Sequence, residues 1–279
     1  MCKISTNKLI VTDFDGTLLN SKGEISQEDY NTLLKLGKRG IVRAIATGRS
    51  PYSFSKVVPS DFPIDYLIFS SGAGAMKWQS KEIAYTTELA PKEVQVIVNE
   101  LMTHNVDFMV HEPIPSNHRF LFHKAGNNNP DFERRIEIYN QFCQPYIPGV
   151  IYDTPATQIL AVLPCNVKWF EDLKKRFPTL KVIRATSPLD GTSIWMEIFR
   201  KNVSKAYGID WICNELNIKP NNVVTVGNDF NDLDMLCQFD NCYVVNNAPD
   251  ELKEQFQQVR SNNNSGFTDA ISKGLGKDF

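Results

Sequence analysis

The sequence predicts an α/β protein in which a Rossmann-like parallel sheet is interrupted by an inserted α+β domain. Short β-rich runs alternate with amphipathic segments near both ends of the chain, and this order changes between about residues 88 and 187. Such alternation is typical of βαβ units around a parallel sheet. With 279 residues the chain is long enough for two ordinary domains. We therefore expect a core formed by residues 1–87 and 188–279 and an inserted domain formed by residues 88–187.

The first part of the core begins with an apolar strand that leads directly into two aspartates. Ser26 is expected to cap a helix that runs to about Lys38, because its hydroxyl can accept a hydrogen bond from the first helical turn. Pro51 starts another helix at a position where its missing N–H costs little. Apolar runs and the turn residues after them predict the remaining elements: strands Lys8–Thr12, Ile41–Ala46 and Asp65–Phe69, and a hairpin at Ser70–Gly74.

The inserted segment has its own order of helices and strands, and about 100 residues can form a separate core. Ser193–Phe199 is a further apolar run that fits either the insert or the first sheet. The insert is expected to contain helices Pro91–His104, Asp131–Phe142 and Lys168–Phe177 and strands Val106–His111, Arg119–Phe122, Gln158–Leu163 and Leu180–Ile183. After it we expect helix Ser204–Leu216, strand Val223–Val226, a loop and helix from Gly227, strand Cys242–Val245 and a polar loop at Ser261–Ser265.

The composition excludes several classes of partner. The chain has 30 basic and 32 acidic residues and no basic block, which disfavours nucleic acid and anionic membranes. Its longest apolar runs, such as Ile159–Leu163, are too short to span a bilayer. The N-terminal residues reach carboxylates too early for a secretory signal, so we expect a cytoplasmic protein. No obligate protein partner is evident.

Asp13 and Asp15 are the strongest chemical feature of the sequence. Side chains two residues apart on an extended segment project toward the same side, and open α/β sheets bind ligands at this end of their strands. The same pair of aspartates could instead form a simple turn. Two adjacent carboxylates favour a bound divalent cation, and Mg²⁺ is the cation that oxygen ligands of this kind suit.

A second cluster, residues 227–232 (GNDFND), follows the strand Val223–Val226 and can supply further metal ligands. Alternatively, it forms only a turn and a helix N-cap. Thr47, beside the flexible Gly48, and Lys205, near the start of a helix, could bind phosphate oxygens. The alternatives are a Thr47 hydroxyl bonded to its own backbone and a Lys205 amine exposed to solvent.

Four segments resemble, in their order and spacing, the motifs of the haloacid dehalogenase (HAD) superfamily of phosphatases: DFDGTLL at 13–19, ATGR at 46–49, SKA at 204–206 and GNDFNDLDML at 227–236. The insert after the second motif, and the return through WMEIFRKNVSKAYGI, resemble the Cof-type hydrolases with a large α/β cap. This resemblance implies a phosphatase of small phosphorylated metabolites, often sugar phosphates, with Mg²⁺ as cofactor and a cap that determines substrate specificity.

The resemblance also implies roles for individual residues. Asp13 would be the nucleophile that forms an aspartyl-phosphate, and Asp15 would be the general acid and base. The substrate would be bound by Thr47, Gly48, Lys205 and Asn231, and the metal by Asp13, the main-chain carbonyl of Asp15, Asn228 and Asp232, the last directly or through water.

Two positions depart from the family pattern. Asn228 stands where the relatives carry a ligating aspartate, so we expect weaker Mg²⁺ binding, unless a local shift lets Asp229 coordinate instead. Ser71 stands where they usually carry asparagine, and its shorter side chain reaches less far toward the phosphate.

Three other functions remain open at this stage. A phosphomutase or phosphotransferase would use the same aspartyl-phosphate, and a weakly active sugar-phosphate sensor would be consistent with Asn228. A receiver-like signalling module is disfavoured by Asp15 and by the cap. Polar residues of the insert could contact sugar hydroxyls, but strand alternation alone would expose half of them: His111, Glu112, His118, Arg119 and His123.

Overall fold

The computed structural model describes residues 7–150 and 152–276, and the chain divides into two compact units. The first unit comprises the chain up to Tyr85 and from Ser204 onward, and the second comprises Thr86–Val203. The expected end of the insert at residue 187 is therefore too early. Strand β11 (Ile194–Phe199) lies between β9 and β10 in the second sheet, with all its side chains buried, so it shows no alternation that would assign it to either sheet.

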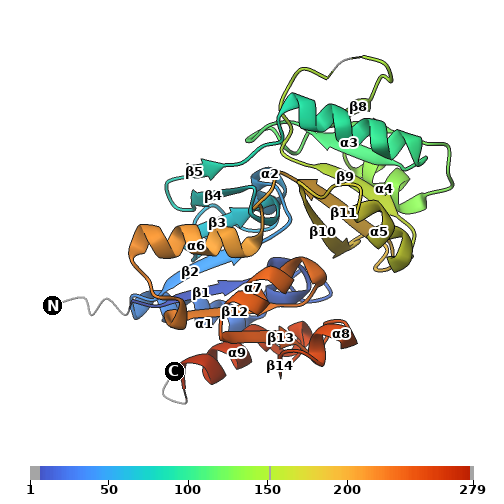
Figure 1. Cartoon of the computed structure of the whole chain (residues 1–279). Helices are drawn as coiled ribbons and strands as arrows, with labels where there is room; N and C mark the ends of the chain where they lie inside the picture. The colour runs from blue at the N-terminus through green and yellow to red at the C-terminus, as the bar shows by residue number, and fades with distance from the viewer. Residues whose placement is uncertain (1–6, 151, 277–279) are drawn as a thin grey trace. The chain divides into compact units, whose positions relative to one another are not determined.

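The first unit contains the expected α/β sheet, in the order β14-β13-β12-β1-β2-β3-β4-β5 (Figure 1). The paired strands from β14 to β3 are parallel, and β4 runs antiparallel to β3, which confirms the predicted hairpin. The strands of this sheet are β1 (Leu9–Thr12), β2 (Val42–Ala46), β3 (Tyr66–Phe69), β4 (Gly74–Lys77), β5 (Glu82–Thr86), β12 (Val223–Gly227), β13 (Asn241–Val245) and β14 (Gln257–Val259).

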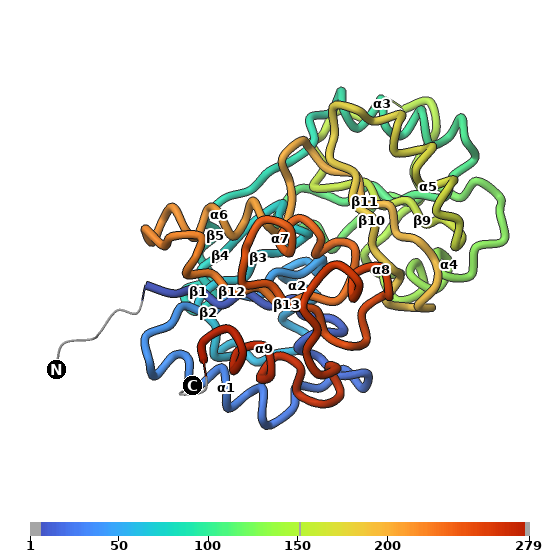
Figure 2. Tube along the Cα trace, turned by 60° about the horizontal axis from the view of Figure 1, so that its bottom comes forward, coloured from blue at the N-terminus to red at the C-terminus, as the bar shows by residue number. Residues whose placement is uncertain are grey.

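Helices cover both faces of this sheet. Apolar residues of α6 and α7 pack with Leu9 and Val11 on one face. On the other face α1 and α9 lie side by side (Figure 2), where the hydroxyls of Thr32 and Thr268 are 2.9 Å apart. The helices of this unit are α1 (Gln27–Lys38), α2 (Pro51–Ser55), α6 (Lys205–Leu216), α7 (Leu233–Gln238), α8 (Asp250–Lys253) and α9 (Gly266–Leu275).

Serine side chains begin three of these helices. Ser26 accepts a hydrogen bond from the backbone N–H of Asp29 at 3.1 Å, as its position in the sequence predicted. Ser50 accepts from the N–H of Ser53 at 3.2 Å, and Ser204 accepts from that of Tyr207 at 3.1 Å. The cap at Ser204 matters most for function, because it determines where α6 begins and therefore where its first residue, Lys205, is placed.

The second unit contains a separate six-stranded sheet in the order β10-β11-β9-β6-β7-β8. Apolar residues of α3 and α5 pack on one face of it, and Phe132 of α4 packs on the other. Its elements are α3 (Pro91–Thr103), β6 (Phe108–His111), β7 (Phe120–His123), α4 (Pro130–Ile138), β8 (Cys143–Pro145), β9 (Ile159–Leu163), α5 (Val167–Lys174), β10 (Lys181–Thr186) and β11. None of the helices in the described parts of the chain has the length and apolarity needed to cross a membrane.

Gly72 lies where the β3–β4 connection passes closest to the start of α6. It has φ +99°, and a Cβ there would overlap the carbonyl oxygen of Ser204. Gly23 also has a positive φ, +76°, but a Cβ there would meet nothing within 4 Å. Both positions strain an L-residue by roughly 1–2 kcal/mol, whereas only position 72 adds a steric clash.

We therefore expect Gly72→Ala to lower the free energy of unfolding by about 2 kcal/mol more than Gly23→Ala does. Urea denaturation of both variants measures the difference. Equal losses in the two variants would show that the close approach at Ser204 relaxes freely.

Candidate active site

The candidate site lies at the carboxyl ends of β1 and β12, which are neighbours in the first sheet. Thr12 pairs with Val226, and the backbone N–H of Asp13 donates to the carbonyl of Val226 at 2.8 Å. The chain leaves β1 toward β2 on one side, while β12 lies on the other, so this is the point where the strand order reverses. The sheet order thereby brings residues 13–17 against residues 227–232.

Lys205 lies at the centre of this site and is fully buried. Its Nζ is 2.6 Å from Asp13 Oδ1, 2.6 Å from Asp232 Oδ1 and 3.4 Å from Asn231 Oδ1. Lys205 is therefore not a solvent-exposed surface amine. The structure brings together four residues that the sequence analysis selected from three separate segments.

Burial and charge shift the pKa values of both partners in this ion pair. The pKa of Asp13 is raised to about 7, mainly by burial and also by the charges of Asp232 and Asp15, against the opposing effect of Lys205. Burial lowers the pKa of Lys205, but Asp13 and Asp232 outweigh this effect and hold it above its usual value. Lys205 is thus a permanent cation, and a second positive charge beside Asp13 would favour the ionised carboxylate.

Asp232 has both carboxylate oxygens occupied by donors of the protein. Its Oδ1 binds Lys205, and its Oδ2 accepts from the backbone N–H groups of Asn228 at 2.7 Å and Asp229 at 3.1 Å. The side chain is fully buried. In this arrangement Asp232 orients Lys205 and the loop that carries Asn228.

The side chain of Asn228 meets three oxygens. The amide atom that faces them lies 3.0 Å from Asp13 Oδ2, 3.1 Å from the Thr17 hydroxyl and 3.2 Å from the main-chain oxygen of Asp15. A nitrogen in this position donates to all three oxygens. An oxygen there instead accepts from the Thr17 hydroxyl and faces the oxygens of Asp13 and Asp15 with no proton between them.

This group of oxygens fits a small divalent cation. Mg²⁺ binds oxygens at about 2.0–2.1 Å in octahedral geometry, so neighbouring ligands lie about 3 Å apart. The spacings of 3.0 and 3.2 Å from Asn228 to Asp13 and Asp15 match that requirement. Residues 7–150 and 152–276 contain no group of three or more His, Cys, Asp or Glu side chains that could hold a metal ion. The candidate ligands here are instead one carboxylate, one main-chain carbonyl and one amide.

Arg49 is a site residue that the sequence analysis did not select. Its Nε and Nη2 donate to the two carboxylate oxygens of Asp15 at 2.7 and 2.6 Å. Its Nη1 donates to the hydroxyl of Ser53 at 3.3 Å, which ties the guanidinium to α2. Its position in the ATGR motif, two residues after Thr47, could have identified Arg49 as a site residue from the sequence.

Thr47 and Gly48 lie just beyond the end of β2, the strand next to β1. The buried Thr47 hydroxyl accepts from the backbone N–H of Arg49 at 3.1 Å. This is the bond to its own backbone that the sequence analysis gave as the alternative to phosphate binding. The N–H of Ser71 donates to the carbonyl of Thr47 at 3.0 Å. Ser71 thereby holds the Thr47 segment through its backbone.

Two asparagines from a distant part of the chain hold the loop that carries Asp13 and Asp15. The amide of Asn247 donates to the carbonyl of Gly16 at 2.8 Å, and that of Asn262 donates to the carbonyl of Leu19 at 2.9 Å. Asn262 is buried and lies in a short helical turn, Asn262–Asn264. The segment 261–265, expected to be an ordinary polar loop, therefore supports the site; its sequence alone carries no sign of these long-range contacts.

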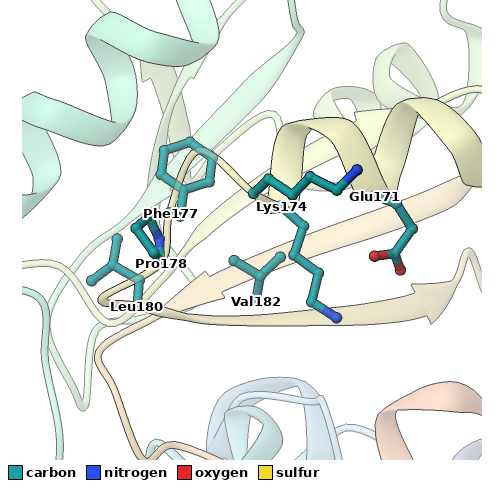
Figure 3. Close-up of a pocket in the computed structure, with 7 residues that line it drawn as sticks. Glu171, Lys174, Phe177, Pro178, Leu180 and Val182 are labelled. Atoms are coloured by element: carbon teal, nitrogen blue, oxygen red, sulfur yellow. The ribbon is translucent and has the colours of Figure 1, made fainter.

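In the second unit, His111 is buried, and its Nδ1 lies 2.9 Å from the carbonyl oxygen of Asn117. Burial lowers the pKa of His111 to about 3, so this side chain is neutral. A pocket of about 300 Å³ lies elsewhere in this unit, beside α5 and β10 (Figure 3). It holds none of the motif residues and is lined by Glu171, Lys174, Lys175, Phe177, Pro178, Leu180 and Val182.

Comparisons with known proteins identify the family of this chain. Residues 10–272 match the family described as haloacid dehalogenase-like hydrolase. A putative phosphatase of Haemophilus influenzae is 25% identical over 263 residues, which cover 92% of this chain and 94% of that protein. The 5-amino-6-(5-phospho-D-ribitylamino)uracil phosphatase YwtE of Bacillus subtilis is 23% identical and covers 96% and 99% of the two chains.

Among solved structures, the HAD subclass IIB sugar phosphatase BT4131 superposes with a TM-score of 0.76 at 19% identity, over 95% of this chain and 98% of its own. At that identity the likeness shows the fold. The match to the family covers nearly the whole chain and includes every segment of the site. The chain therefore belongs to the haloacid dehalogenase-like hydrolases, as a Cof-type enzyme.

Proposed function

We propose that this protein is a Mg²⁺-dependent phosphatase that hydrolyses small phosphorylated metabolites, with sugar phosphates as the substrate class, through an aspartyl-phosphate on Asp13. The observation that carries the proposal is the buried contact of Lys205 with Asp13 and Asp232. A permanent cation beside a buried carboxylate compensates the charge that a phosphoryl group would bring to it. The second unit, expected to be a specificity cap, would determine which compounds are accepted.

Asp13 and Asp15 carry out different steps of the hydrolysis. An oxygen of Asp13 attacks phosphorus as the bond to the leaving alcohol breaks. Asp15, which must carry a proton on one oxygen at this step while the other still accepts from Arg49, transfers that proton to the alcohol. Asp15 then removes a proton from water, which cleaves the aspartyl-phosphate and releases inorganic phosphate. Lys205 and the Thr47 segment stabilise the negative charge on the phosphoryl oxygens. Gly48 and Asn231 would complete the substrate contacts.

Asp13 Oδ2, the main-chain oxygen of Asp15 and Asn228 Oδ1 would hold the magnesium ion. When bound, the ion supplies positive charge that offsets the repulsion between the nucleophile and the phosphate. We assign the third ligand to Asn228 rather than Asp229 because the Asn228 amide already lies 3.0 Å from Asp13 Oδ2. Asp232 positions these groups through its hydrogen bonds with Lys205 and with the backbone N–H groups of Asn228 and Asp229.

The named relatives support the class of substrate. The Haemophilus protein is described as a putative phosphatase, and the Bacillus protein acts on a phosphorylated ribityl compound. BT4131, which shares the fold, is described as a sugar phosphatase. The substrates in these descriptions are small phosphorylated molecules, which is why sugar phosphates come first in the test.

Phosphate release from a panel of sugar phosphates, nucleotides, pyridoxal phosphate and flavin mononucleotide, with Mg²⁺ and with EDTA, tests the proposal. We expect Mg²⁺-dependent release of inorganic phosphate from at least one sugar phosphate. Transfer of the phosphoryl group to a second alcohol, without release, would identify a phosphomutase or phosphotransferase. Binding of a sugar phosphate without turnover would identify a sensor.

Arg49 is expected to affect turnover through Asp15. Arg49→Lys retains the positive charge but cannot form two parallel hydrogen bonds to one carboxylate, whereas Arg49→Met loses both. The pair is partly exposed, at 27% for Arg49 and 38% for Asp15, so solvent weakens it. We expect kcat to fall about tenfold in Arg49→Lys and further in Arg49→Met, with KM less affected. A change confined to KM in both variants would place Arg49 in substrate binding instead.

A further inference from the structure

Asn228 is the one candidate metal ligand that can also act as a hydrogen-bond donor. The amide atom that faces Asp13 Oδ2 at 3.0 Å and the Asp15 carbonyl at 3.2 Å can be either its nitrogen or its oxygen, because a half-turn of the amide exchanges the two. The two orientations suit different states of the site. Without a cation the nitrogen satisfies both oxygens, and with a cation only the oxygen can serve as a ligand.

The surroundings of the amide accept both orientations. The Thr17 hydroxyl, 3.1 Å away, can donate to an oxygen or accept from a nitrogen. The other amide atom lies over Gly16, where a Cβ would crowd it, so the absence of a side chain leaves space for either atom. The backbone N–H of Asn228 is bonded to Asp232 Oδ2 at 2.7 Å, so the amide can turn while the main chain stays in place.

We propose that Asn228 substitutes for the metal: its NH₂ group holds Asp13 and the Asp15 carbonyl when no cation is bound, and the amide turns to present its oxygen when Mg²⁺ binds. This inference rests on the proposed metal site. Mg²⁺ then has to displace the NH₂ group of Asn228 from Asp13 and the Asp15 carbonyl, and does not enter a site that is otherwise empty of donors. An aspartate at position 228 would bind the cation more tightly, because it carries a negative charge. It has no proton to donate, however, so it would leave the cation-free site with unpaired negative oxygens.

Two consequences can be measured without an activity assay. In wild-type protein, the two side-chain NH₂ proton resonances of Asn228 should shift, and their slow exchange with solvent should be lost, on titration with MgCl₂. In Asn228→Asp, the melting temperature in EDTA should fall by several degrees, and Mg²⁺ should bind about tenfold more tightly and restore more stability than in the wild type. The amide resonances are assigned by their disappearance from the ¹⁵N-labelled Asn228→Asp spectrum.

Asn20→Asp is the matched control, because it adds the same charge to the same unit. The side-chain oxygen of Asn20 only accepts, from the N–H groups of Lys22 at 2.9 Å and Glu24 at 3.0 Å, and aspartate can retain both bonds. This control should melt like wild type in EDTA and show the wild-type Mg²⁺ affinity. A general effect of added negative charge would appear in both variants.

The outcomes separate this inference from the proposed function. Equal Mg²⁺ affinity in wild type and Asn228→Asp, or amide resonances that do not respond to saturating Mg²⁺, would overturn the exchange while leaving an Mg²⁺-dependent phosphatase intact. Loss of Mg²⁺ binding in Asp229→Asn would overturn it in favour of Asp229 as the ligand. If neither wild type nor Asn228→Asp binds Mg²⁺, both the exchange and the proposed metal site are wrong.

Discussion

Asp13→Asn is expected to reduce phosphate release by at least about three orders of magnitude, because the amide cannot form the acyl-phosphate bond. The fold should survive this change. The amide oxygen introduced at position 13 can still accept from Lys205, and the positive charge of Lys205 keeps its ion pair with Asp232 at 2.6 Å. Turnover of the best substrate from the panel and the melting temperature, measured on the same preparation, separate loss of chemistry from loss of structure.

The control for this variant is Asp61→Asn, which removes the same charge from an exposed position outside the site. It should retain wild-type turnover. Trapping with beryllium or aluminium fluoride should place the phosphate analogue on Asp13. Substantial turnover in Asp13→Asn, or an adduct on another side chain, would exclude Asp13 as the nucleophile.

Lys205→Met should produce the largest loss of stability among these variants. The substitution leaves Asp13 and Asp232 buried and close together without the cation that bonds to both at 2.6 Å. Removing one partner of a buried ion pair typically costs about 3–5 kcal/mol, because the remaining charge is uncompensated. We expect a loss of that order in the free energy of unfolding in EDTA, together with loss of turnover.

The double variant Lys205→Met, Asp232→Asn tests the cause. It removes one of the two uncompensated charges, while the amide oxygen introduced at position 232 can still accept from the N–H groups of Asn228 and Asp229. We expect part of the stability to return and turnover to remain absent. If Lys205→Met alone unfolds at the wild-type denaturant concentration, the buried cation does not compensate these carboxylates.

Local signals predicted most of the elements of the first unit. Ser26 and Pro51 begin helices where the sequence analysis placed them, because a cap depends on the residue and its immediate neighbours. The strand Ile194–Phe199 could not be assigned in the same way. Its side chains are buried on both faces, and an apolar run of this kind fits either sheet until its partners β9 and β10 are known.

The same division applies to the site. Asp13, Asp15 and the GNDFND segment could be selected because closely spaced oxygen ligands leave a recognisable pattern in the sequence. The support from Asn247 and Asn262 left no such pattern, since each bonds to a carbonyl more than 200 residues away, at separations of 231 and 243. A main-chain acceptor carries no side-chain signature that would reveal its partner.

By itself the sequence determined the fold class, the family, the cap at Ser26 and the helix start at Pro51. Only the tertiary structure decided that Lys205 is fully buried between Asp13 and Asp232, and that Arg49 binds Asp15. The physical reason is the range of the interactions. Caps and turns form between residues a few positions apart, whereas the contact of Lys205 with Asp13 spans 192 positions and depends on the packing of α6 against the sheet that contains β1.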